Sequence, residues 1–178
     1  ELSNVNSAGG FVNTAYNCVF NYCYIGEKAQ INAKTAGGFM HTSNYSTFNS
    51  CYFAGTINAS EGATGFALNG TGLNVNNCYS SGNLLYNSHD GRDTLNTFNL
   101  NVNSFSKVRS GVSITNSYSI AYIYNIKENS YYYNETGKRS DSSTIVGYFK
   151  FDYLLNNNST TWVKKNQSDY FPQLNGVG

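Results

Sequence analysis

The chain has 178 residues, enough for one domain with a core, and only 12% of them are charged, with a net charge of +1. It has no long basic run of the kind that binds nucleic acid, and no apolar stretch approaches 18 residues, so we expect no nucleic-acid partner and no membrane insertion of this segment. Its polarity comes from 28 Asn residues, and 16% of the residues are aromatic. Asn and Gly favour turns, and Tyr, Phe, Val and Ile favour strands, so the composition predicts an all-β fold.

The first half of the chain repeats one short pattern. A Gly-Phe pair recurs in AGGF, AGGF and ATGF, and each Phe is followed twelve residues later by Cys-Tyr, with a period of 28 and then 27 residues. A unit too short for a propeller blade predicts one coil of a β-solenoid (β-helix), whose coils stack at about 4.8 Å and align equivalent residues in columns. Because Asn before Cys can bend the strand and reset its alternation, the sequence leaves open which column faces inward. The regular coils span residues 8–85, and their columns contain Phe11, Phe39, Phe66, Cys23, Cys51, Cys78, Tyr24, Tyr52 and Tyr79.

The second half keeps this spacing while its residues diverge. Counting twelve from Phe105 and from Phe149 again reaches a small residue followed by an aromatic one, in Ser117-Tyr118 and Thr161-Trp162. We therefore predict about five coils in all, the last two within residues 86–162. The Phe spacing grows to 39 and 44 residues there, which predicts one inserted loop in each coil. Residues 163–178 form a terminating segment, so residues 1–178 are predicted to be a single β-solenoid domain.

Two quoted stretches carry a resemblance to a known family. AGGF…NSCYFAGTI and ATGF…NNCYSSGNL resemble the GLUG repeat, a Gly-Phe…Asn-Cys-Tyr…Gly-x-apolar unit of bacterial surface proteins. The ending TTWVKKNQSDYFPQLNG resembles the Trp…Tyr-Pro-x-Leu close that often follows such arrays, although Phe171 stands here between Tyr170 and Pro172. The resemblance covers residues 8–84 and the surroundings of Gln173–Leu174. It implies a β-solenoid in secreted or surface-anchored, often adhesin-like proteins, and it supplies no catalytic residues.

Two segments of the second half hold the candidate binding residues. SHDGRD gathers four ionisable residues, which fits a ligand or metal loop, a carboxylate pair for acid–base chemistry, or simply a polar Asp-Gly turn. SYYYNETGKR sets three Tyr beside a polar turn, where the rings would bind a sugar or a protein or pack on the flank of the solenoid. The residues are His89, Asp90, Arg92 and Asp93 in the first segment and Tyr131, Tyr132 and Tyr133 in the second.

Three of the four Cys residues fall in one column and none occurs in CxxC. Stacked coils bring the Cα atoms of Cys23, Cys51 and Cys78 to a separation that permits a disulfide, about 4.4–6.8 Å. The same column also suits a buried ladder of free thiols, because free Cys behaves as a small apolar residue. Metal binding and redox activity are the remaining alternatives.

We expect a non-enzymatic module at the cell surface or outside the cell, adhesin- or stalk-like, that presents loops to a protein or glycan on another surface. One alternative is a filament subunit that stacks end to end with further copies of itself, because open strand edges need caps and no capping helix is visible in residues 1–7. The other is a β-helical carbohydrate-active enzyme, although the ten Asp and Glu residues do not recur at equivalent positions. We predict no catalytic residue, no metal and no cofactor.

Overall fold

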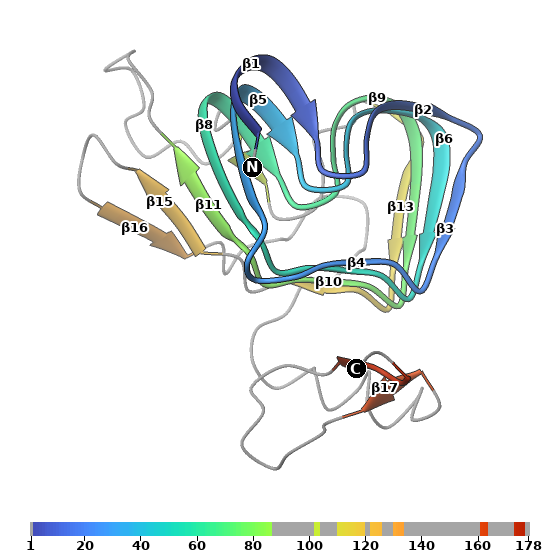
Figure 1. Ribbon diagram of the computed structural model, residues 1–178. Coiled ribbons are helices and arrows are strands. Elements are labelled where there is room, and N and C mark those ends of the chain that lie inside the picture. Colours follow the sequence, from blue (N-terminus) through green and yellow to red (C-terminus); the bar gives the residue numbers. More distant parts are fainter. Residues whose placement is uncertain are drawn as a thin grey trace.

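The computed structural model describes residues 2–86, 102–103, 110–119, 122–125, 130–133, 161–163 and 173–176. Every regular element within these ranges is a β-strand, and parallel strands of successive turns stack into a β-solenoid of about three turns (Figure 1). The predicted all-β solenoid is therefore confirmed. A search of the same residues finds no helix long and apolar enough to cross a membrane.

Three parallel sheets form the sides of the solenoid (Figure 1). Sheet A contains β1 (Leu2–Gly9), β5 (Gln30–Gly37), β8 (Thr56–Thr64), β11 (Asn83–Tyr86) and β15 (Tyr122–Asn125), with β12 (Val102–Asn103) also on β8 and antiparallel β16 (Ser130–Tyr133) on β15. Sheet B contains β2 (Val12–Tyr16), β6 (Met40–Asn49), β9 (Ala67–Asn76) and β13 (Val112–Thr115), with β3 (Val19–Asn21) also on β6. Sheet C contains β4 (Tyr24–Ile25), β7 (Tyr52–Phe53), β10 (Tyr79–Ser80) and β14 (Tyr118–Ser119).

Each turn of the chain passes through sheets A, B and C in that order. We call residues 2–25 coil one, residues 30–53 coil two and residues 56–80 coil three. Strands β11 to β15 then add to all three sheets. Outside them, β17 (Trp162–Val163) and β18 (Gln173–Leu174) form an antiparallel pair.

The interior is built from two stacks of aromatic rings. The ring of Phe39 lies 4.9 Å from that of Phe66 and 5.3 Å from that of Phe11. In the second stack the rings of Phe20 and Phe48 are 4.7 Å apart, and an edge-to-face contact of 5.0 Å between Phe39 and Phe48 joins the stacks. Aliphatic residues continue the second stack, because Phe48 is in register with Val75 and Val75 with Ile114.

The corner between sheets B and C turns at a residue with left-handed backbone. This residue directly precedes the Cys column, and φ lies between 45° and 55° at its four members, Tyr22, Ser50, Asn77 and Asn116. A residue of this kind interrupts the alternation of a strand. Phe48 and Cys51, which strict alternation would place on opposite faces, are both fully buried in the interior. Because of this bend, the column that contains Phe48 and the column that contains Cys51 both face inward.

The Tyr column lies on the other face of sheet C. The ring of Tyr52 stacks on those of Tyr24 and Tyr79 at 5.1 Å and 4.8 Å, whereas the neighbouring Cys51 and Phe53 belong to the interior cluster. Trp162 covers this column, since its ring lies 5.2 Å from that of Tyr79 and it is 1% exposed. The count of twelve aligns Trp162 with the Tyr column, but the structure places it in β17, outside sheet C and against the flank of the column.

The Gly-Phe pattern marks the corner between sheets A and B. A Cβ atom on Gly38 would lie 2.1 Å from the carbonyl oxygen of Gly65 in the next coil and 2.5 Å from Cδ2 of Phe53. Only glycine allows the backbones of neighbouring coils to approach this closely. The glycine therefore recurs because the coil closes tightly over the buried Phe that follows it.

Replacing Phe39 by Ala is expected to lower the free energy of unfolding by about 3–5 kcal/mol, because Phe39 is fully buried between two rings. Phe11→Ala is the matched control from the same column, and it should cost only about 1 kcal/mol because Phe11 is 52% exposed. Urea unfolding followed by circular dichroism measures both values. Equal losses would contradict the register of the Phe column.

Candidate functional site

The Cys column forms a hydrogen-bonded ladder that we call the thiol–hydroxyl ladder, made of Cys23, Cys51, Cys78 and Ser117. The backbone N–H of each member donates to the side chain of the next, with distances of 3.4 Å from Cys23 to Cys51, 3.2 Å from Cys51 to Cys78 and 3.0 Å from Cys78 to Ser117. Each side chain also donates to the carbonyl two residues earlier, as Cys78 Sγ does to Asn76 at 3.1 Å. The four cysteines of the chain are free thiols.

The three thiols of the ladder differ in acidity. Burial raises the pKa of the Cys23 thiol and raises that of the fully buried Cys78 well above its usual value. The hydrogen bond with Cys78 lowers the pKa of the Cys51 thiol between them. Burial also raises the pKa of Tyr52 to about 12. Because Cys51 and Cys78 are fully buried and bonded from coil to coil, the ladder connects successive coils inside the solenoid.

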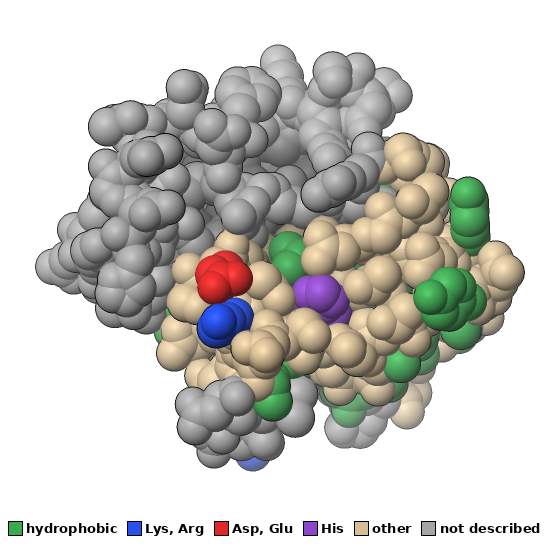
Figure 2. Space-filling view, turned by 90° about the horizontal axis from the view of Figure 1, so that it is seen from above, with side chains coloured by type: hydrophobic (Ala, Val, Ile, Leu, Met, Phe, Trp, Pro, Cys, Tyr) green, Lys and Arg blue, Asp and Glu red, His purple; other side chains and the backbone are tan. Residues whose placement is uncertain are grey.

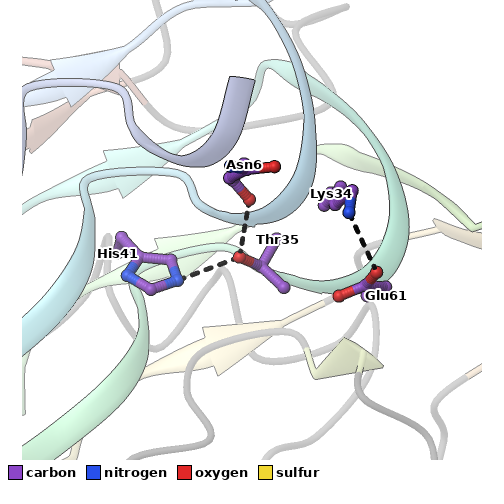
Figure 3. Close-up of polar contacts among 5 residues, drawn as sticks. All are labelled: Asn6, Lys34, Thr35, His41 and Glu61. Carbon is purple, nitrogen blue, oxygen red and sulfur yellow. Dashed lines mark hydrogen bonds and ion pairs between the residues drawn. The ribbon is translucent and has the colours of Figure 1, made fainter. Parts of the chain in front are cut away.

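A second polar cluster lies where sheets A and B meet (Figure 3). Both ring nitrogens of His41 are occupied: Nδ1 lies 3.0 Å from Thr42 Oγ1, while Nε2 lies 3.0 Å from Thr35 Oγ1 and 3.3 Å from Asn69 Nδ2. The Thr35 hydroxyl in turn donates to the backbone carbonyl of Asn6 at 3.0 Å. Burial lowers the pKa of His41, so the imidazole is neutral at pH 7 and connects neighbouring coils.

The outer face of sheet B carries ladders of amides and hydroxyls. Asn49 Nδ2 donates to Asn21 Oδ1 at 2.9 Å, and Asn74 Nδ2 donates to Thr47 Oγ1 at 3.4 Å. Thr115 Oγ1 donates to an Asn76 side-chain oxygen at 3.0 Å on the same face. The strands of this sheet contain no Asp, Glu, Lys or Arg, so the face is polar and uncharged.

Large hydrophobic side chains interrupt this polar surface. Figure 2, a view from above, shows hydrophobic side chains standing out on the right-hand side, which is the side of sheet B, among uncharged ones. The exposed members on the strands and bends of this sheet are Tyr16, Val19, Tyr22 and Tyr45. Nothing in the sequence singled these residues out, because Tyr is frequent in the chain and exposure depends on which residues bend the backbone.

The residues predicted as binding residues lie mostly outside the described structure. His89, Asp90, Arg92 and Asp93 fall outside the described residues, as do Phe105 and Phe149 of the predicted columns. Tyr131, Tyr132 and Tyr133 belong to β16, whose backbone pairs with β15 through Tyr124, Ile123 and Tyr122.

Few charged groups oppose one another in the described part of the chain. The one ion pair found there joins Lys34 and Glu61 at 3.9 Å, and both side chains are largely exposed (Figure 3). No group of three or more His, Cys, Asp or Glu side chains in the described residues is placed to hold a metal ion. In the described part of the chain, the uncharged outer face of sheet B and its exposed rings are therefore candidate surfaces for recognition.

Comparison with known proteins finds no matching family model, no matching curated protein and no matching solved structure.

Cys78→Ser is expected to be better tolerated than Cys78→Ala. A hydroxyl already serves this ladder at Ser117, whereas Ala would leave the buried N–H of Cys51 without an acceptor, at about 1–3 kcal/mol. Urea unfolding of both variants measures the difference, with Cys18→Ala, which removes a partly exposed thiol, as the control. An Ala variant as stable as the Ser variant would contradict the structural role of the ladder.

Proposed function

We propose that the chain is a non-enzymatic extracellular or cell-surface module, adhesin- or stalk-like, that presents inserted loops to a protein or glycan partner. In this proposal the module is a GLUG-repeat solenoid of five coils with a 27–28-residue repeat, and the last two coils carry the insertions. The sequence resemblance and the stacked coils support this reading.

The pairing of β8 carries the proposal. Along this one strand, Ala59 is in register with Tyr86 of β11, and Ala63 is in register with Val102 of β12. Three residues, 60–62, lie between these partners on β8, whereas fifteen, 87–101, lie between them in the following chain, so the chain is twelve residues longer there. These additional residues fit an inserted loop, and the segment contains SHDGRD, the densest group of ionisable residues in the sequence.

The coils on which the insertion is mounted suit a scaffold. Backbone pairing, two stacks of rings and the thiol–hydroxyl ladder connect each coil to the next along its whole circumference. Residues on loops carried by a rigid scaffold are the usual sites of recognition. A module of this kind needs no catalytic group of its own.

The test is saturable binding of the fluorescently labelled full chain to intact cells and to extracellular matrix. We expect a variant with His89, Asp90, Arg92 and Asp93 all changed to Ser to fold normally and to bind at least about tenfold more weakly, a loss of about 1.4 kcal/mol. Lys34→Ser, a change at an exposed residue of β5 and outside SHDGRD, is the control. Absence of saturable binding by the unchanged chain would contradict the proposal.

A second function, end-to-end stacking into a filament, is favoured by the exposure of those members of the interior columns that lie in coil one. Phe11 in coil one is 52% exposed, whereas Phe39 and Phe66 at the same position in coils two and three are fully buried. Phe20 and Cys23 are likewise only partly buried, while Phe48 and Cys51 are fully buried. A coil of a second copy placed against β1 to β4 would cover these residues with contacts that already occur between coils one and two.

Sedimentation velocity over a hundredfold range of concentration tests this second function. We expect the weight-average mass to rise with concentration and Phe11→Asp to abolish the rise, because the change buries a charge against the next copy. Asn58→Asp, which adds the same single negative charge at an exposed position of coil three, is the control. A constant monomer mass for the unchanged chain would exclude stacking.

A further inference from the structure

The exposed large side chains of coils one and two fall into two groups. Phe11 occupies a position whose counterparts in later coils are buried, so an additional coil would cover it. Tyr16 and Val19 differ, because their register partners in later coils are polar residues on the outside of sheet B: Asn44 and Thr71 for Tyr16, and Thr47 and Asn74 for Val19. Stacking along the axis would not bury this second group.

Two further exposed side chains of sheet B and its bends, Tyr22 and Tyr45, occupy unfavourable backbone. Tyr22 has a φ of 55° and Tyr45 a φ of 57°, and both side chains are about two-thirds exposed, at 64% and 66%. A left-handed conformation costs a bulky L-residue about 1–2 kcal/mol. Strain of this kind persists only where the surrounding structure holds it in place, and it is concentrated at functional sites.

The other coils place more suitable residues at the same two bends. The bend at Tyr45 has Asn17, Gly72 and Gly111, and the bend at Tyr22 has Ser50, Asn77 and Asn116, all with positive φ. Gly and Asn are the residues that adopt this backbone most readily. Coil packing therefore does not require Tyr at either position.

The ring of Tyr45 lies against coil three. It fills the place that a side chain on Gly72 would need, since a Cβ atom there would lie 2.5 Å from Tyr45 Cδ1 and 3.1 Å from Cε1. The ring thus leans on Gly72, while the side chain as a whole stays about two-thirds exposed. An exposed aromatic ring with a polar tip is suited to stack on the C–H face of a sugar ring.

The surroundings determine which ligand suits these rings. The amide and hydroxyl ladders around them offer donors and acceptors at a regular spacing of about 4.8 Å, and they are fixed by hydrogen bonds along the axis. With no Asp, Glu, Lys or Arg on the strands of sheet B, an anionic or cationic partner finds no opposite charge there. A ligand rich in hydroxyl groups and without charge fits this surface.

We propose that the outer face of sheet B binds a neutral polysaccharide, with Tyr45 and Tyr22 as stacking platforms and the Asn and Thr ladders as hydrogen-bonding partners. Tyr22 aligns with Ser50, five residues beyond Tyr45, so the two platforms are about 16 Å apart along the strands. That separation calls for an extended oligomer and not a single sugar. The proposal rests on the function proposed above: it specifies the glycan partner as a neutral polysaccharide and adds sheet B as a second binding surface beside the inserted loops.

Affinity electrophoresis of the full chain in gels containing a soluble β-glucan, a mannan or a galactan tests the proposal, with polygalacturonate as the charged comparison. The variant Tyr45→Gly, Tyr22→Asn replaces each platform by a residue that a later coil holds at the same bend, Gly72 for Tyr45 and Asn77 for Tyr22. We expect it to unfold at the same or a higher temperature and to bind the neutral polysaccharide at least about tenfold more weakly. Tyr24→Ala, at an exposed ring on sheet C, is the matched control and should keep the affinity.

Three outcomes would overturn the proposal: no retardation by any of the neutral polysaccharides, unchanged retardation of the double variant, or equal retardation by polygalacturonate. The cell-binding assay separates this failure from that of the proposed function. If the double variant binds cells as the unchanged chain does, the module still recognises a partner, and sheet B is not the surface that it uses.

Discussion

Parallel pairing of each coil with the next is the interaction on which the rest of this molecule depends. A parallel ladder in register places residue types one above another, so a single choice of side chain is repeated in space at about 4.8 Å. Rings then stack on rings, and amides donate hydrogen bonds to amides, between residues that are only about one coil apart in the sequence. The Phe39–Phe66 contact at 4.9 Å and the Asn49–Asn21 hydrogen bond at 2.9 Å are two products of the same register.

The left-handed corner converts this register into a closed coil. Because the residue before the Cys column has positive φ, the chain turns from sheet B to sheet C and the next side chain is directed inward. The backbone N–H of each Cys in the column would otherwise be buried without a partner. It donates to the side chain of the Cys at the same position in the following coil. A small side chain with a donor and an acceptor is needed here, which explains why Cys and Ser share the position.

Much of the fold could be predicted because its information is local and repeated. The Gly-Phe and Cys-Tyr spacings mark corners where one coil closes on the next, so a count of residues indicates an all-β solenoid. Which columns face the interior could not be predicted, since this depends on the positive φ of the one residue that precedes each Cys, such as Tyr22 or Ser50. The position of Trp162 escaped the count for another reason: antiparallel pairing with Leu174 places its ring on the flank of the Tyr column.

The candidate surfaces differ in how far a sequence could reveal them. An ionisable cluster such as SHDGRD can be recognised from the sequence alone. It is therefore predicted to be a functional site whatever its geometry. The exposed rings of sheet B carry no such mark, because the exposed Tyr45 is of the same residue type as Tyr79, which is buried beneath Trp162. Comparing the coils with one another supplies the missing reference: each coil is a structural control for its neighbours, and a strained Tyr where they hold Gly or Asn stands out as a residue that stability does not require.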